Sequence, residues 1–259
     1  MKCFGQVWTI TPPAFGVFLL LLTAGPVGGD EISDACNDGL SDITNILRAC
    51  DVVIGRQETD RATRIRAFQV RARTHLAARN ITAALADFST AISALPDGKL
   101  KGYVLYLRAQ SRFDYTQQSP QSIKDSLNDL ERANGLAPAN PRILETLARL
   151  YQAAGRNQDA VKSTGEALIY DPRSISARKT RAQLYEADGL TREALNDLNV
   201  LVSRQLANPD LLTWRGRLHE KRRNLIQALA DYRNAARVKT TQEVLDGIQR
   251  VERVLGVDK

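Results

Sequence analysis

The 259-residue sequence is poor in the residues that carry catalysis. It has three cysteines, two histidines and one methionine, and aromatic residues make up only 6% of it. It contains none of the motifs GxGxxG, GxxxxGK[ST], HExxH, GxSxG and CxxC, which serve cofactor binding, phosphate binding, metal-assisted hydrolysis, nucleophilic catalysis and redox chemistry. The sequence therefore predicts a protein that is not an enzyme and that holds no metal and no cofactor.

The first 29 residues differ in composition from the rest of the chain. MKCFGQVWTITPP has one lysine and no acid, AFGVFLLLLTA is an apolar run of 11 residues, and GPVGG precedes the first acid, Asp30. This order indicates a secretory signal peptide over residues 1–29, because the apolar run is too short to span a bilayer comfortably. We expect cleavage near Gly29 or after Ala24, with an uncleaved anchor as the alternative. The mature protein is then exported, periplasmic or secreted, and has no stable membrane span.

Two cysteines, Cys36 and Cys50, remain after the leader, in a segment over residues 30–60. A pair of cysteines in an exported protein indicates one disulfide, worth about 3 kcal/mol in the chain-entropy model. Gly39 permits the chain reversal that would bring Cys36 back along a helix beginning near Ser41. Two free buried thiols and an intermolecular bridge are the alternatives.

The rest of the chain repeats itself. ALADF begins at Ala84 and ALADY begins at Ala228, and a small residue recurs between them. The equivalent positions are Ala84, Ser126, Ala160, Ala194 and Ala228. Successive steps are 42, 34, 34 and 34 residues. A fixed period of this length indicates a repeat protein. We interpret the chain as five units, of which the second carries eight extra residues, around Thr116–Pro120 and in PDGKLKG.

The clearest unit runs from Pro141 to Pro172 and predicts two helices. Asn140 is a good N-cap, and Leu144, Leu147, Ala148 and Tyr151 form one apolar stripe. Gly155 ends the first helix, because glycine adopts the left-handed conformation cheaply. A second helix follows, with small residues that allow close packing.

This pattern resembles the tetratricopeptide repeat, on residues such as Ala72, Ala84, Phe88 and Pro96 in the first unit. The resemblance implies an all-α, right-handed α-solenoid of antiparallel helix pairs, with about five units over residues 61–240. Helices in residues 30–60 and 241–259 would cap its two ends.

Arginine and aspartate recur together in four units. The slot of Leu147 holds arginine in the other units, and the slot of Ser163 then holds aspartate. The predicted structural ion pairs are Arg71–Asp87, Arg108–Asp129, Arg181–Asp197 and Arg215–Asp231. We expect the aliphatic part of each arginine side chain to pack on the helix interface and its guanidinium group to form hydrogen bonds with the aspartate. His75 and His219 share the slot of Tyr151 and Tyr185, so we interpret both histidines as packing residues.

In this family the first helices line a concave groove, so the residues beside their packing stripe become candidates for binding a partner. They are Arg66, Gln69, Arg73, Tyr103, Tyr106, Phe113, Arg142, Arg149, Lys179 and Arg217. The groove is expected to be basic with an aromatic centre in the first three units and of mixed charge in the last two. Tyr103, Tyr106 and Phe113 share a helix face, and they are either anchors for an apolar side chain or core residues of a shifted second unit.

We therefore expect a non-enzymatic adaptor of the bacterial periplasm or envelope that binds a protein or peptide with acidic and apolar groups. The alternatives are a regulatory subunit or substrate receptor of an envelope protease or cell-wall hydrolase, and a self-assembling homo-oligomeric scaffold. The net charge is +7, and loss of Lys2 with the leader leaves +6. Because the charges are interspersed, a nucleic-acid partner is not expected.

Overall fold

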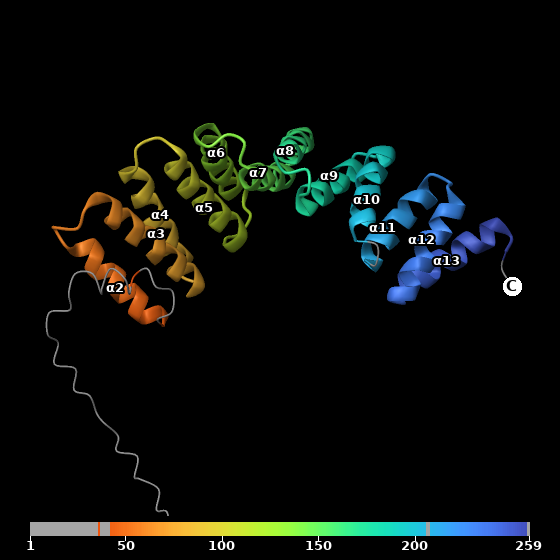
Figure 1. Cartoon of the computed structure of the whole chain (residues 1–259), viewed down its shortest axis with the longest axis horizontal. Coiled ribbons are helices and arrows are strands. Elements are labelled where there is room, and N and C mark those ends of the chain that lie inside the picture. The colour runs from red at the N-terminus through yellow and green to blue at the C-terminus, as the bar shows by residue number, and fades with distance from the viewer. Residues whose placement is uncertain (1–35, 37–41, 206–207, 258–259) are drawn as a thin grey trace, which may run out of the picture.

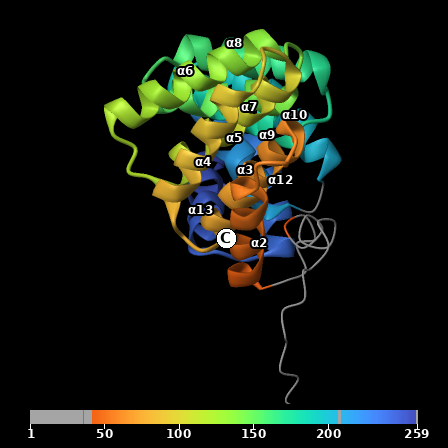
Figure 2. The ribbon, with the colours of Figure 1, turned by 90° about the vertical axis from the view of Figure 1, so that its left-hand side faces the viewer.

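The computed structural model describes Cys36, residues 42–205 and residues 208–257. The predicted signal peptide, residues 1–29, lies outside the described residues. Within the described part of the chain there are twelve α-helices and no strand. The predicted all-α solenoid is confirmed, since the helices follow one another in a row from α2 to α13 (Figure 1) and a view turned by 90° looks along that row (Figure 2).

Ten of the helices form five consecutive pairs. The first helices are α3 (Arg61–Ala77), α5 (Lys99–Tyr115), α7 (Pro141–Ala153), α9 (Ile175–Ala187) and α11 (Pro209–Lys221). The second helices are α4 (Ile81–Ala94), α6 (Pro120–Leu136), α8 (Asn157–Tyr170), α10 (Thr191–Arg204) and α12 (Leu225–Val238). Helix α2 (Ile43–Gly55) precedes the pairs and α13 (Gln242–Leu255) follows them.

Small residues sit at the same buried position in every helix of a pair. On the first helices these are Ala72, Ala109, Ala148, Ala182 and Gly216, and on the second helices Ala84, Ser126, Ala160, Ala194 and Ala228. Each of the alanines and Ser126 is completely buried. Short side chains let antiparallel helices approach closely, which explains why this position recurs in the sequence.

The extra residues of the second unit lengthen its helices rather than only its loops. Arg108 is the tenth residue of α5 and Asp129 the tenth of α6, whereas Arg181 and Asp197 are the seventh residues of α9 and α10. The turn that joins α5 to α6 has only four residues, 116–119. The start of α6 therefore extends about one turn beyond the end of α7.

Contacts between units show which side of the solenoid is the inner one. Apart from neighbours in sequence, the main contacts in the described chain are small ones that join α5 with α7, α7 with α9 and α11 with α13. Helix α13 occupies the position of a sixth first helix, so all of these contacts are between first helices. Because elements on the inside of a curve lie closer together, the first helices line the concave side.

In the described chain one further helix packs on each end of the five pairs, at the places where the capping helices are predicted. Helix α2 begins after Asp42, whose side chain accepts a hydrogen bond from the Asn45 amide, and buries Val53 and Cys50. At the other end, Gly247 of α13 lies against the Tyr232 ring, where a Cβ atom would come within 2.8 Å of that ring. Arg250 takes the small-residue position of α13 and donates two hydrogen bonds to Glu220 of α11.

The four predicted arginine–aspartate pairs are all present, and each joins the two helices of one unit. In each pair the arginine Nε and Nη2 atoms donate to the two oxygens of one carboxylate, at 2.6–2.9 Å. The carboxylates are almost fully buried, between 3% and 10% exposed. In the third unit Leu147 and Ser163 are buried in the same positions. The Arg108–Asp129 pair also establishes the register of the second unit.

The two histidines pack between helices, as their shared slot predicts. The His75 Nε2 atom lies 4.0 Å from an oxygen of Asp87. The Nδ1 atom of His219 is buried without a hydrogen-bond partner in the described chain. Burial lowers the pKa of His219, partly offset by the nearby Asp231 carboxylate. His219 therefore stays neutral at pH 7, as a packing residue should.

Removing one member of a buried ion pair should cost more than removing both. We predict that Asp231→Ala lowers the free energy of unfolding by about 3 kcal/mol, because it leaves Arg215 without its buried partner. The double variant R215L/D231S restores the combination found in the third unit and should cost at least 1 kcal/mol less than D231A. Urea denaturation followed by circular dichroism measures both. A double variant that loses as much stability as D231A, or more, would show that the pair carries no coupling.

The turns inside the units predict a stabilising substitution. In four units the first helix ends on a left-handed residue, namely Arg79, Gly155, Gly189 and Arg223, with φ between 60° and 76°. A left-handed arginine is strained by about 1–2 kcal/mol, whereas glycine is not. Arg223→Gly should raise the free energy of unfolding by about 0.5–1 kcal/mol after its larger unfolded-state entropy is counted. Arg223→Ala keeps the strain, so it serves as the control and should bring no gain.

Candidate functional site

The candidate site is the concave face of the first three units, on α3, α5 and α7. Here the helix pattern leaves side chains that do not pack against a second helix. Of the ten predicted groove residues, seven are exposed: Arg66, Arg73, Tyr103, Arg142, Arg149, Lys179 and Arg217. Gln69 and Tyr106 are half-buried. This arrangement leaves arginine and tyrosine side chains available on one face.

The prediction that Phe113 is a groove anchor is wrong. Its side chain is 7% exposed and belongs to the hydrophobic core of the first three units. Helix α6 begins three residues earlier, relative to its aspartate, than α4, α10 and α12, so its added first turn packs beside the last turn of α5. The Arg149 guanidinium covers the Phe113 ring, 5.1 Å from its centre. The Phe113 ring therefore belongs to the core beneath the concave face, and Arg149 packs over it.

Tyr103 and Tyr106 form an aromatic pair at the centre of this face. Their ring centres are 6.2 Å apart and the rings are inclined by 30°. Arg73 of α3 donates a hydrogen bond of 2.8 Å to the Tyr103 hydroxyl, and so links two units. Burial raises the pKa of Tyr106, while Thr146 and Arg142 of α7 oppose that rise. Tyr106 thus stays a neutral phenol, and the two rings lie between Arg73 of α3 and Arg142 of α7.

The arginines around the aromatic pair differ in how they are neutralised. Arg149 forms an ion pair of 3.0 Å with Asp114. Within the described part of the chain, no carboxylate oxygen lies within 4.0 Å of a guanidinium nitrogen of Arg66, Arg73 or Arg142. We call these three residues the free arginines. Arginine binds carboxylates through paired hydrogen bonds, so this face is chemically suited to acidic groups.

On the concave face of the last two units, several charges are paired with neighbouring residues. Glu186 accepts hydrogen bonds from Trp214 at 2.5 Å and Lys221 at 2.8 Å, and it also lies 3.8 Å from Arg217. Burial tends to raise the pKa of Glu186, but these donors outweigh it and the pKa falls below its usual range. Sequence reasoning missed Trp214, which lies three residues before the predicted groove residue Arg217. Lys179 is exposed and pairs with no acid of the described chain.

Two hollows with partly apolar linings open on the described surface of the first three units. One has a volume of about 430 Å³ and adjoins the concave face at the start of α3. Ile65, Leu95, Pro96 and Leu100 form its wall, and Arg61 and Arg66 stand on its rim.

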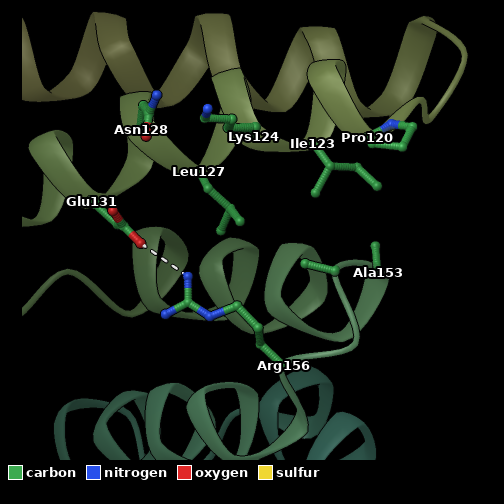
Figure 3. Close-up of a pocket in the computed structure, with 9 residues that line it drawn as sticks. Pro120, Ile123, Lys124, Leu127, Asn128, Glu131, Ala153 and Arg156 are labelled. Atoms are coloured by element: carbon green, nitrogen blue, oxygen red, sulfur yellow. Dashed lines mark ion pairs between the residues drawn. The ribbon is translucent and has the colours of Figure 1, made fainter.

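The other hollow, about 490 Å³, lies below the overhanging start of α6, beside the end of α7. Figure 3 shows Ile123 and Leu127 pointing into it from α6 and Ala153 facing them. On its rim Glu131 lies 3.7 Å from Arg156, so the charges there are paired.

Nothing in the described residues points to metal chemistry or to a membrane span. No group of three or more histidine, cysteine, aspartate or glutamate side chains is placed to hold a metal ion among them. No helix in this part of the chain combines the length and the apolar character that crossing a bilayer requires.

Comparison with known proteins places the fold. No protein-family model and no curated protein matches the sequence. Among solved structures, a tetratricopeptide repeat protein from Parabacteroides merdae is similar, with a TM-score of 0.62 and 16% identity over 88% of this chain and 85% of that one. YrrB, a tetratricopeptide repeat protein with an unusual peptide-binding site, has a TM-score of 0.62 and 14% identity over 79% of this chain and 99% of its own.

PilF of Pseudomonas aeruginosa is also similar, with a TM-score of 0.57 and 16% identity over 76% of this chain and 86% of its own. All three proteins share the fold of this chain although their sequences are at most 16% identical to it. The chain has the tetratricopeptide repeat fold, as its sequence pattern predicts.

Proposed function

We propose that this chain is a non-enzymatic protein-binding adaptor whose concave face holds an acidic, partly apolar segment of a partner protein. The observation that carries the proposal is the set of free arginines, Arg66, Arg73 and Arg142, around the aromatic pair. An exposed tyrosine offers a large rigid surface at low entropic cost, and arginine adds carboxylate recognition. Together they match a peptide that carries both kinds of group.

The fold supports the same conclusion. Stacked helix pairs give an extended curved face, and repeat proteins commonly bind along such faces. The similarity to YrrB, which has a peptide-binding site of its own, is consistent with such a role. In the last two units Glu186 pairs with Lys221 and Glu220 pairs with Arg250. We therefore favour binding through the first three units over binding through the last two.

We infer that the adaptor works outside the cytoplasm, in the bacterial periplasm or envelope. The leader-like composition of residues 1–29 supports export. Cys36 and Cys50 support it as well, because their Cα atoms are 5.0 Å apart and both side chains are buried, which suits a disulfide. Disulfides persist in oxidising compartments. A disulfide here would fasten the segment before α2 to the first cap.

Reversing the charge of two free arginines should abolish recognition of acidic peptides. The probe is a fluorescent peptide, acetylated and amidated, with a central leucine between two pairs of glutamates. Anisotropy titration should give a dissociation constant for R73E/R142E at least tenfold weaker than for the unchanged protein, because two attractive contacts become repulsive.

The matched control is R192E/R237E, which changes the net charge equally on exposed residues of the second helices α10 and α12. We expect this control to bind within twofold of the unchanged protein. Equal weakening by both double variants would mean that net charge, and not the concave face, attracts the peptide. Sedimentation of the unchanged protein tests the rival hypothesis of self-assembly.

Export and the disulfide are tested together on the full-length chain expressed in a bacterium. We expect the protein in the periplasmic fraction, with a mature N-terminus at Asp30 or Gly25 by terminal sequencing. Alkylation without reduction should leave Cys36 and Cys50 unlabelled, and prior reduction should add two labels by mass spectrometry. A cytoplasmic protein with an intact N-terminus would contradict the export proposal, and two labels without reduction would contradict the disulfide.

A further inference from the structure

The hollow at the start of α3 lies next to the proposed binding face and continues it. Gln69 and Arg66 belong both to its lining and to the predicted groove. Along α3 the next turn carries Arg73, and along α5 the residue one turn after Leu100 is Tyr103. Arg73 and Tyr103 are hydrogen-bonded to each other. A peptide lying on the aromatic pair therefore reaches this hollow without leaving the concave face.

The hollow has an apolar wall and basic residues on its rim, and no acidic residue lines it. Its wall is apolar: Ile65 and Leu95 are each 6% exposed and form its floor, while Leu100 is 52% exposed at its lip. The polar lining consists of Arg61, Arg66 and Gln69, and no acidic side chain takes part. Arg61 donates to the backbone carbonyl of Ala94, and within the described residues neither arginine forms an ion pair.

An apolar wall below a cationic rim favours a ligand that has both an apolar group and negative charge. A purely apolar ligand leaves the rim unused, and a purely acidic ligand leaves the wall and the exposed Leu100 uncovered. The volume of about 430 Å³ is within the range of sites that enclose small ligands or side chains. Burying a leucine-sized or phenylalanine-sized side chain contributes about 1.5–3 kcal/mol. The occupant that uses both features is a large apolar side chain flanked by acidic residues.

We propose that this hollow is a specificity pocket for one large aliphatic or aromatic side chain of the partner, within an internal acidic segment of it. The proposal rests on the proposed function, because the same peptide must lie on the concave face. The pocket would determine the register of the peptide: its apolar residue enters between α3 and α5, and acidic residues to one side meet Arg73 and Arg142. The partner is thus recognised by an apolar residue within an acidic stretch, independently of any free chain terminus.

The test compares two acetylated and amidated peptides that differ only at the centre, leucine or alanine, each between two pairs of glutamates. Anisotropy titration of the unchanged protein should give at least tenfold tighter binding of the leucine peptide. Ala62→Phe fills the pocket from the exposed second residue of α3, and Leu100→Asp replaces its lip. Both variants should reduce the preference for leucine to less than twofold, while the alanine peptide keeps its affinity in A62F.

The matched control is Ala153→Phe, which fills the hollow below α6 instead (Figure 3). It should keep the full preference for leucine. Circular dichroism melting of all variants establishes that each is folded, and Leu100 and Ala62 are exposed enough for the changes to be tolerated.

The outcomes separate the two proposals. A tenfold preference that A62F and L100D abolish supports the pocket. No preference in the unchanged protein, or a preference that A62F leaves intact, overturns the pocket while the charge reversal R73E/R142E still tests the concave face. Tighter binding of peptides with a free C-terminal carboxylate than of amidated ones, by tenfold or more, also overturns the internal-segment proposal. If neither peptide binds, both proposals fail.

Discussion

The whole structure depends on the close approach of two antiparallel helices at one small residue on each. Where the second helices carry Ala84, Ser126, Ala160, Ala194 and Ala228, nothing larger is found, and every one of these side chains is completely buried. At Gly216 an added Cβ would already come within 3.2 Å of the Tyr232 ring. The tightness of this contact sets the spacing of helices within a unit, and the repetition of the unit then produces the curved row.

The arginine–aspartate pairs add direction to this packing. A small-residue contact is apolar and tolerates sliding, whereas a bidentate arginine–carboxylate contact has a single geometry. Each pair joins the first helix of a unit to its second helix, so Arg181 and Asp197 align α9 with α10. The third unit replaces both residues with Leu147 and Ser163, which are buried equally well. The third unit therefore folds without the pair, and we interpret the pair as a contact that fixes the register of the two helices more than it adds stability.

Sequence reasoning predicts the fold well because most repeat units carry the same signals for it. The spacing of 34 residues, the small-residue slot and the paired arginine and aspartate each recur, so an error in one unit is corrected by the others. The residues of the candidate site differ from unit to unit, so no repeat confirms them, and the sequence predicts the site less accurately than the fold. The spacing of Phe113 from Tyr106 matches a helix face and so favours a place on the surface. The added first turn of α6 gives the last turn of α5 a neighbour, and so buries the Phe113 ring. Ion pairing between units, such as Arg149 with Asp114, also depends on distances that no repeat pattern contains.

The same logic explains where binding chemistry can arise in such a protein. A packing slot is constrained by both helices of a unit, but a concave slot is constrained by neither, so its residue can differ freely between units. At the first concave slot the five units carry Arg66, Tyr103, Arg142, Ser176 and Asp210. This change from basic and aromatic to polar and acidic has no counterpart among the buried slots, and packing does not require it. Toward the last units, Trp214 and Lys221 close over Glu186, which removes its charge from the surface. Around Tyr103 no such closure occurs, and the cationic, aromatic surface that results is the part of the molecule whose chemistry the fold itself does not explain.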